Sequence, residues 1–480
     1  MSESFGKNLA AIVGEAFVEE GEGIDERYRT AIGVKRRATP GWLARPADTG
    51  EVAAVVRLCG AAVVPITVVG GQTGTCGGAL PSDGGLALSL ERMNRIVEID
   101  RLSMTMTLEA GCILQRAQEA AEQQGALLPL DLGARGSAVI GGVIGTNAGG
   151  NRVLRWGMMR DMVLGLEAVL ADGTVVSSLG KMIKDNAGYA WKHLLIGSEG
   201  TLGIVTRAVL RLRPLPTTRQ TALVAASSFE NAIAVLRQLE IALSGQLSSF
   251  EIMWEDFYRI HTEAQLPQRP RPMPLGHPVY ALIEAMGGNQ EADRDHFEAA
   301  LSSLVAEGLI ADAVVAQSAR ECDALWAVRE DLGPGYAPLR PFAAYDVSMG
   351  IADMPAFVDD ARAGVLACYP EAKVLFYGHA GDGNLHVLVS TGSMDDVTAQ
   401  ALNDAIYGAV RGVGGSIAAE HGIGTTRAAY LGWTRSPSEL ALMRTIRLAL
   451  DPKGILNPGK LFEPAELNEP FRSTGQERER

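Results

Sequence analysis

The stretch VVGGQTGTCGG, residues 68–78, follows an apolar run and places five glycines within eleven residues. Glycine lets backbone N–H groups approach a ligand with no side chain in the way, which is what a pyrophosphate requires. The stretch therefore predicts a dinucleotide diphosphate site, with a tight structural loop as the alternative. A Walker signature and a clear G-x-G-x-x-G are both missing, which weakens P-loop and Rossmann interpretations.

A second glycine-rich stretch, DLGARGSAVIGGVIGTNAGGNRVLRWG, spans residues 131–157. Hydroxyl and amide side chains at Ser137, Thr146 and Asn147 are interspersed among its glycines. Its periodicity is too weak for a helix or a strand throughout, so we expect a long structured loop or a substrate-facing surface. Backbone of this kind could wrap a flat ring system with its ribityl and phosphate groups.

The bulk composition sets the class of protein. The chain has 480 residues and a net charge of -13 without a basic block, which disfavours nucleic acid or an anionic membrane as its main partner. No apolar run approaches the roughly 20 residues of a membrane span, and the start MSESFGKNLA lacks the order of a secretion signal. Five widely spaced cysteines suit reduced thiols in a cytosol.

Two halves with different element patterns are expected, with a boundary at residues 214–216. Before it, a helix capped by Asp48 or Thr49 leads to the strand VPITVV, a helix spans 112–124, and MVLGLEAVLADGTVVSS predicts a hairpin. After it, strands and helices alternate, which indicates an α+β domain with one sheet and helices on one face. The expected elements are strands at 221–226, near 280, 311–317 and 342–349, and helices at 229–243, 290–307, 319–331, 353–367 and 436–450.

Six motifs in one order carry a resemblance to a known family. They are the two glycine-rich stretches, GSEGTLGIVT (197–206) after KDNAGYAWKHLL, YGHAGDGNLH (377–386), AAEHGIGTTR (418–427) and DPKGILNPGKLF (451–462). From about residue 40 to 464 the chain resembles the FAD-linked oxidases with the vanillyl-alcohol-oxidase fold, in the branch of D-2-hydroxyacid dehydrogenases (D-lactate, D-2-hydroxyglutarate and glycolate types).

The resemblance implies an α+β protein with three parts. An FAD-binding domain of two subdomains would occupy residues 1–215, and an α+β (ferredoxin-like) substrate domain residues 216–415. A C-terminal helical segment, 416–464, would return to the FAD domain. The polar and charged composition of residues 465–480 predicts a disordered tail.

The resemblance also implies which residues hold FAD. Pyrophosphate contacts fall to the first loop, ring and ribityl contacts to the second, adenine contacts to the strand after GSEGTLG, and one contact to the C-terminal segment. In this order the residues are Gly70, Gly71, Gln72, Thr73, Gly74, Thr75 and Gly78; Ser137, Gly141, Gly142, Gly145, Thr146, Asn147 and Gly150; Ile204 and Val205; and Asn457. Members that tether FAD use a His or Cys in these loops. The loops contain no histidine and Cys76 stands in another context, so we expect non-covalent FAD.

His379 and His386 lie seven residues apart in YGHAGDGNLH. Residues at this spacing point to opposite faces of a straight strand, so they converge only if the turn-forming GDGN bends the chain. Two imidazoles and a carboxylate form a typical three-ligand zinc site. The resemblance supplies Glu420 as the third ligand and His421 as the base, with zinc the expected ion and manganese or iron as alternatives. Core histidines that shape a turn are the structural alternative.

The implied chemistry is oxidation of a D-2-hydroxy acid to a 2-keto acid. The cation would acidify the hydroxyl, His421 would take its proton, hydride would pass to flavin N5, and Arg329 would bind the carboxylate. Further polar residues of hydroxyglutarate-type members are replaced by Gly333, Ala344 and Leu388. Because three apolar positions leave little to stabilise a second buried carboxylate, a substrate with one carboxylate is favoured over 2-hydroxyglutarate.

Electrons would leave through a carrier such as an electron-transfer flavoprotein or a quinone. Two other functions stay open, namely an oxidase that makes hydrogen peroxide and a flavin-binding sensor without catalysis. We expect a cytoplasmic protein, or one peripheral to a membrane, and a homodimer by the habit of the family.

Overall fold

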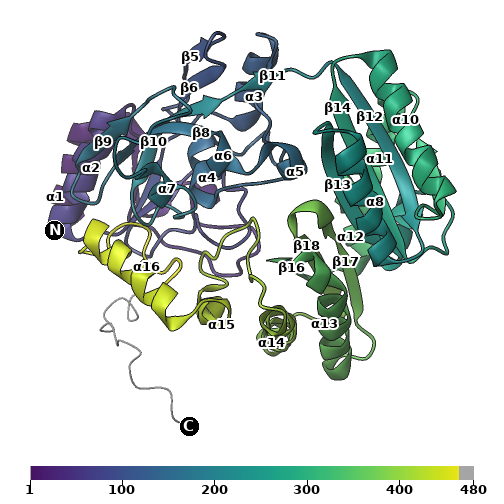
Figure 1. Cartoon of the computed structure of the whole chain (residues 1–480). Helices are drawn as coiled ribbons and strands as arrows, with labels where there is room; N and C mark the ends of the chain where they lie inside the picture. The colour runs from purple at the N-terminus through teal and green to yellow at the C-terminus, as the bar shows by residue number, and fades with distance from the viewer. Residues whose placement is uncertain (1, 464–480) are drawn as a thin grey trace. The chain divides into compact units, whose positions relative to one another are not determined.

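The computed structural model describes residues 2–463, which form two compact units (Figure 1). Among these residues, the first unit combines 2–149, 158–215 and 420–463, and the second combines 150–157 and 216–419. The predicted disordered tail lies outside the described residues. Within the described part of the chain, no helix combines the length and the apolar character needed to cross a bilayer.

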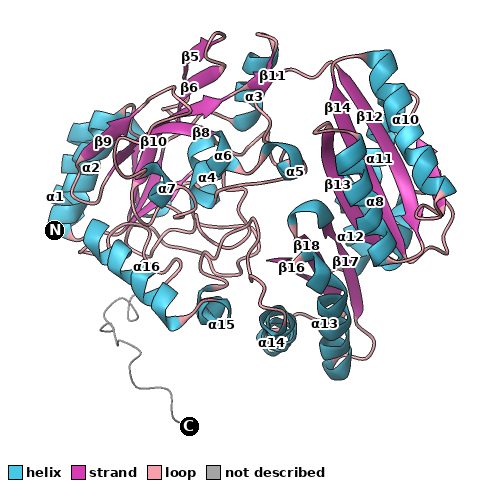
Figure 2. Ribbon diagram, viewed as in Figure 1, coloured by secondary structure: helices cyan, strands magenta, loops and turns pink. Residues whose placement is uncertain are grey.

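The first unit contains two main sheets and a short strand pair (Figure 2). One sheet has the order β1 (Val18–Glu20), β2 (Trp42–Ala44), β4 (Leu86–Ser89), β3 (Ile66–Val69), in which β2, β4 and β3 run parallel. The other is antiparallel, with the order β5 (Ile96–Asp100), β6 (Thr105–Glu109), β10 (Ile204–Arg211), β8 (Val163–Val169), β9 (Val175–Ser178). Strand β7 (Ala126–Leu127) pairs with β11 (Arg213–Pro214). The hairpin predicted across Asp172-Gly173 is confirmed as β8–β9.

Helices surround these sheets. They are α1 (Ser2–Val13), α2 (Thr49–Ala62), α3 (Leu114–Glu122), α4 (Ile140–Thr146), α6 (Met159–Met162), α7 (Lys192–Leu195), α15 (Leu431–Thr434) and α16 (Pro437–Leu450). Asp48 caps α2 by accepting a hydrogen bond from the Glu51 N–H at 2.9 Å. Ser436 and Glu439 form a capping box at α16, whose first residue is Pro437. These local signals explain where both helices begin.

The second unit is built on one antiparallel sheet of seven strands. Its order is β15 (Asp312–Val315), β12 (Thr218–Ala226), β14 (Val279–Gly287), β13 (Leu247–Trp254), β17 (Lys373–His379), β18 (Asn384–Ser390), β16 (Ala343–Ser348). Its helices are α5 (Val153–Trp156), α8 (Phe229–Ala242), α9 (Glu255–Gln265), α10 (Gln290–Ala306), α11 (Ala319–Glu330), α12 (Leu332–Tyr336), α13 (Met354–Cys368) and α14 (Asp396–Gly412).

Helices pack against both faces of this sheet, so the expectation of helices on one face is wrong. Phe257 of α9 stacks on Tyr377 at 4.1 Å between ring centroids, and side chains of α11 join the same buried cluster. Phe357 of α13 contacts the neighbouring Phe376, which points to the opposite face. The strands carry apolar residues on both sides because both faces are covered, and period-2 alternation is therefore weak. The α+β class itself is confirmed.

Candidate active site

The first glycine-rich loop offers a row of backbone donors. Within residues 2–463, none of the N–H groups of residues 71–75 donates a hydrogen bond to the chain. An added Cβ at Gly74 would meet nothing within 4 Å, and Gly74 and Thr75 are exposed. Consecutive N–H groups with open space before them form an anion-binding surface. The donor set therefore fits a diphosphate.

Segments far apart in the sequence meet at this loop. Gly71 packs so closely on Ser137 that a Cβ would overlap its carbonyl oxygen and lie 2.7 Å from its carbonyl carbon. The Glu199 N–H donates to the Gly145 carbonyl at 2.8 Å. Asn457 donates through Nδ2 to the carbonyls of Gly78 (3.1 Å) and Glu199 (2.6 Å). The buried Oδ1 of Asn457 has no hydrogen-bond partner in the described part of the chain, which leaves one acceptor for a ligand.

Part of the second glycine-rich stretch is helical, which the weak periodicity did not predict. Residues 140–146 form α4, whose apolar side chains are buried. Gly141 lies against Ala110, where a Cβ would stand 2.9 Å from the alanine Cβ. Asn147 ends the helix at φ 51° and its Oδ1 accepts from the Arg160 N–H at 2.9 Å. Tertiary packing thus overrides the low helix propensity of glycine.

The other predicted cofactor residues lie in four environments. Thr146 donates to the Gly142 carbonyl at 3.2 Å. Ile204 and Val205 are buried at the start of β10, paired with β8. Gly150 begins the short segment that belongs to the second unit. Gln72 and Thr73 are half-buried in the first loop. The loop residues, α4 and Asn457 are brought together within the first unit.

Cys76 is the one sulfur nucleophile within the first glycine-rich loop. It is buried and donates to the His421 carbonyl at 3.0 Å. Burial, with a smaller contribution from the Glu199 charge, raises the pKa of its thiol to about 11. A protonated and enclosed thiol is a poor nucleophile, which agrees with non-covalent FAD.

In the second unit, the histidine motif forms the β17–β18 hairpin. The turn runs through a short 3-10 segment and Gly383, whose φ is 88°. In the register, His379 pairs with Asn384 and Tyr377 pairs with His386. Because His379 and Tyr377 point to one face and paired residues share a face, both histidines lie on the same side of the sheet. The hairpin therefore brings two histidines that are seven residues apart to the same face of the sheet.

Each imidazole lies between a carboxylate and the other imidazole. Nδ1 of His379 is 2.7 Å from Oε1 of Glu251, and Nδ1 of His386 is 3.6 Å from Oδ1 of Asp346. Both carboxylates are 1% exposed. The two Nε2 atoms face each other at 3.3 Å. Two neutral rings whose Nδ1–H groups face the carboxylates present opposed lone pairs, which a cation or a shared proton must separate.

Glu420, the expected third ligand, is the first residue of the C-terminal segment of the first unit. The chain enters this position through Ala419, whose N–H donates to the Asp346 carbonyl at 3.3 Å. His421 follows at once. The next residues are held within the first unit, where the carboxylate of Glu199 accepts from the N–H groups of Ile423 (2.7 Å) and Gly424 (2.8 Å). Burial raises the pKa of Glu199.

Arg329 is a buried residue of α11. It is 5% exposed, its Nε donates to Oε2 of Glu251 at 3.1 Å, and its guanidinium stacks on Tyr377 at 4.6 Å from the ring centroid. Burial alone would raise the pKa of Glu251, but its interactions with His379 and Arg329 bring it below its ordinary value. One carboxylate thus joins the candidate metal ligand to the candidate substrate arginine.

The positions expected to govern the second carboxylate are apolar in the fold as well. Ala344 and Leu388 are directly paired across β16 and β18, and Leu388 is buried in the aromatic cluster of α9 and α11. Gly333 lies in α12, with open space at its Cβ. Within the second unit these three positions offer no hydrogen-bonding side chain.

Sequence reasoning missed Glu251 and Asp346. Each is a single carboxylate inside an apolar strand, in LSSFEIMW and AAYDVS. A buried carboxylate requires a partner, so an acidic residue within such a run is a signal that could have been followed.

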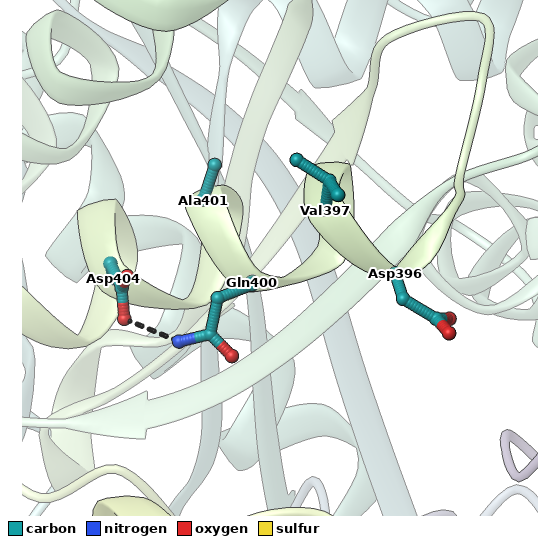
Figure 3. A pocket seen from close by; sticks show the side chains of 5 residues that line it. All are labelled: Asp396, Val397, Gln400, Ala401 and Asp404. Carbon is teal, nitrogen blue, oxygen red and sulfur yellow. Dashed lines mark hydrogen bonds between the residues drawn. The ribbon is translucent and has the colours of Figure 1, made fainter.

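The surface of α14 carries a shallow hollow lined by Asp396, Val397, Gln400, Ala401 and Asp404 (Figure 3). All five side chains come from one helix, and Gln400 donates to Asp404 at 2.9 Å. Because its lining residues all belong to α14, it does not have the character of a site.

Comparisons with known proteins agree with this architecture. Residues 40–178 match the model of an FAD binding domain, and residues 215–461 match that of the C-terminal domain of FAD linked oxidases. A D-2-hydroxyglutarate dehydrogenase of Xanthomonas citri pv. viticola is 41% identical over 89% of this chain and 91% of its own length. The mitochondrial D-2-hydroxyglutarate dehydrogenase of Bos taurus is 38% identical over 88% of this chain and 76% of its own length.

Among solved structures, p-cresol methylhydroxylase with substrate bound superposes with a TM-score of 0.77 at 18% identity, covering 98% of both chains. That likeness establishes the fold. The chain therefore belongs to the FAD-linked oxidase family, with the fold of the vanillyl-alcohol oxidases, and is an FAD-dependent oxidoreductase in its 2-hydroxyacid dehydrogenase branch.

Proposed function

We propose that this enzyme oxidises a D-2-hydroxy acid to the 2-keto acid with non-covalent FAD and a divalent cation, and passes the electrons to a carrier protein or a quinone. The observation that carries the proposal is the opposed pair of Nε2 atoms of His379 and His386, each ring backed by a buried carboxylate. FAD, when bound, accepts the two electrons of the oxidation.

The metal is supported by the donor geometry. Nitrogens at 2.0–2.1 Å from a tetrahedral zinc ion stand about 3.3 to 3.4 Å apart, and the two Nε2 atoms are 3.3 Å apart. The Glu251 carboxylate, 2.7 Å from Nδ1 of His379, fixes the tautomer of this ring that leaves Nε2 as the ligand atom. When bound, the cation lowers the pKa of a coordinated substrate hydroxyl. Zinc suits this nitrogen-rich set, and manganese or iron are alternatives.

The roles of the remaining residues follow from their chemistry. Arg329, anchored through Nε, keeps its two outer nitrogens for a bidentate contact with the substrate carboxylate. His421 adjoins the ligand Glu420 and would remove the hydroxyl proton as general base. The donor row at residues 71–75 would bind the diphosphate of FAD.

The names of similar proteins and the side chains of the second unit point to different substrates. The similar proteins are named for D-2-hydroxyglutarate, which makes this acid the first to test. The apolar positions Gly333, Ala344 and Leu388 favour an acid with one carboxylate and an apolar or small remainder. We propose that such acids are oxidised with the higher kcat/KM.

Anaerobic mixing of the FAD-loaded enzyme with D- and L-2-hydroxy acids tests the proposal. Loss of the yellow flavin absorbance with a D-acid and not with its L-isomer is the expected result. A flavin that stays oxidised with every 2-hydroxy acid would favour the non-catalytic sensor instead.

A further inference from the structure

Glu251 occupies an unusual position in the centre of the seven-stranded sheet. It lies on β13 with 1% exposure, and its two oxygens are directed to two different functional groups. Oε1 faces Nδ1 of His379 at 2.7 Å, while Oε2 accepts from Nε of Arg329 at 3.1 Å. The register places Glu251 directly opposite His379, so the contact is built into the strand pairing.

The contact with His379 determines which ring nitrogen is available. A carboxylate accepts hydrogen bonds only, so it selects the tautomer with the proton on Nδ1. That tautomer leaves the lone pair on Nε2, the atom that faces His386. Glu251 therefore prepares His379 to bind a cation through Nε2.

The contact with Arg329 fixes the guanidinium from the same carboxylate. Its plane is further held by the Tyr377 ring, whose hydroxyl is hydrogen-bonded to Tyr336. Tyr377 pairs with His386 across the hairpin. The residues that hold Arg329, namely Glu251 and Tyr377, therefore lie on the same paired strands as the two histidines. The relative position of His379 and Arg329 is thus tied to the pairing of these strands.

We propose that Glu251 is a positioning residue that holds His379 in its metal-binding tautomer and Arg329 in its substrate-binding orientation. The inference rests on the proposed function, since it assumes that His379 binds a cation. It predicts that one substitution weakens metal binding and carboxylate binding together.

Glu284 provides a matched control on the neighbouring strand β14. It is also fully buried and also pairs with an arginine, Arg152, through Nε at 3.0 Å. Its other recorded partners are Trp326 and Ser248, and no histidine is among them. Replacing Glu284 therefore removes a comparable buried charge without touching the proposed ligands.

The experiment compares Glu251→Gln with Glu284→Gln in the FAD-loaded protein. The amide introduced by Glu251→Gln has one acceptor and one donor group where the carboxylate had two acceptors, so either His379 changes tautomer or Arg329 faces an N–H. Zinc affinity is measured by competition with a chelator of known affinity, the ligand field by cobalt(II) absorption, and KM by turnover of the best hydroxy acid. Flavin content and the melting transition confirm folding.

We expect zinc affinity to fall about 10- to 100-fold in Glu251→Gln, as for other residues that support a ligand histidine. KM should rise, and the cobalt spectrum should change. Glu284→Gln should keep the wild-type zinc affinity. If Glu251→Gln does not fold, Ser249→Ala should show the same effects to a smaller degree, because it removes the hydroxyl that lies 3.1 Å from Oε1 of Glu251 and 2.6 Å from the Asn151 carbonyl.

Wild-type zinc affinity in Glu251→Gln, or in Ser249→Ala where that variant is used, overturns the inference and leaves the proposed function standing. An equal loss in both glutamine variants also overturns it, because a general effect of removing buried charge would then suffice. A wild-type protein that takes up neither zinc nor cobalt overturns the inference and the metal-dependent function together.

Discussion

Replacing Gly71 by alanine tests whether the first glycine-rich loop holds the FAD diphosphate. The new Cβ would overlap the Ser137 carbonyl oxygen and lie 2.7 Å from its carbon, and both are backbone atoms that cannot rotate away. Overpacking of this kind costs about 1–3 kcal/mol. The loop at residues 68–78 must then move away from residues 137–138, which carries its free N–H groups out of position.

The effect on FAD follows from the same energy. If the loop relaxes in the apoprotein, FAD binding must return it to the strained conformation. A strain of about 1–3 kcal/mol then raises the dissociation constant of FAD by about 5- to 150-fold. Fluorescence titration of the apoprotein with FAD measures this change. Thermal unfolding of the apoprotein provides the comparison, because a relaxed loop should lower its stability by less than the full strain.

Gly74→Ala is the matched control, since its Cβ would meet nothing within 4 Å. Apoprotein stability should be unchanged in this variant, and FAD affinity should fall only if the methyl group enters the cofactor's space. Wild-type FAD affinity in both alanine variants would refute the assignment of this loop to the diphosphate.

Three further predictions concern the candidate residues. His386→Ala should reduce bound metal from one ion per chain to none by elemental analysis while FAD content is kept, and an unchanged metal content would show that the ion binds elsewhere. His421→Ala should retain FAD but slow its anaerobic reduction by about 100-fold or more, the usual contribution of a general base; reduction at the wild-type rate would remove this role. Burial lowers the pKa of His261 to about 4, below an unfolded value of about 6.5. The neutral ring thus contributes stability that is complete above pH 6.5 and is lost as the pH falls toward 4, about 3 kcal/mol in all. His261→Asn should flatten this part of the pH dependence of unfolding, and an identical slope in the variant would contradict the origin assigned to it.

Local signals in the sequence determined much of what could be predicted. Asp48 marks the start of α2, Asp172-Gly173 the β8–β9 turn, and the GDGN run the hairpin that joins the two histidines. Each of these depends on residues close together in the chain, where capping and turn preferences act.

Features that depend on distant contacts were not predicted. Helix α4 contains three glycines within IGGVIGT and is stabilised by packing against Ala110. The expectations included neither β13 nor α9, and β13 carries Glu251. Glu251 meets His379, 128 residues away in the sequence, only because their two strands are paired. The pairing of strands that are far apart in the chain cannot be read from a single sequence.

The most direct test of whether the oxidation depends on the cation is the rate of flavin reduction by a D-2-hydroxy acid, measured with and without the cation. The FAD-loaded protein would be treated with a chelator, mixed with substrate in a stopped-flow instrument without oxygen, and measured again after addition of zinc. Reduction should be nearly abolished by the chelator and restored by one equivalent of zinc. Equal rates in the treated and restored protein, with no metal found by elemental analysis, would contradict a metal-dependent oxidation.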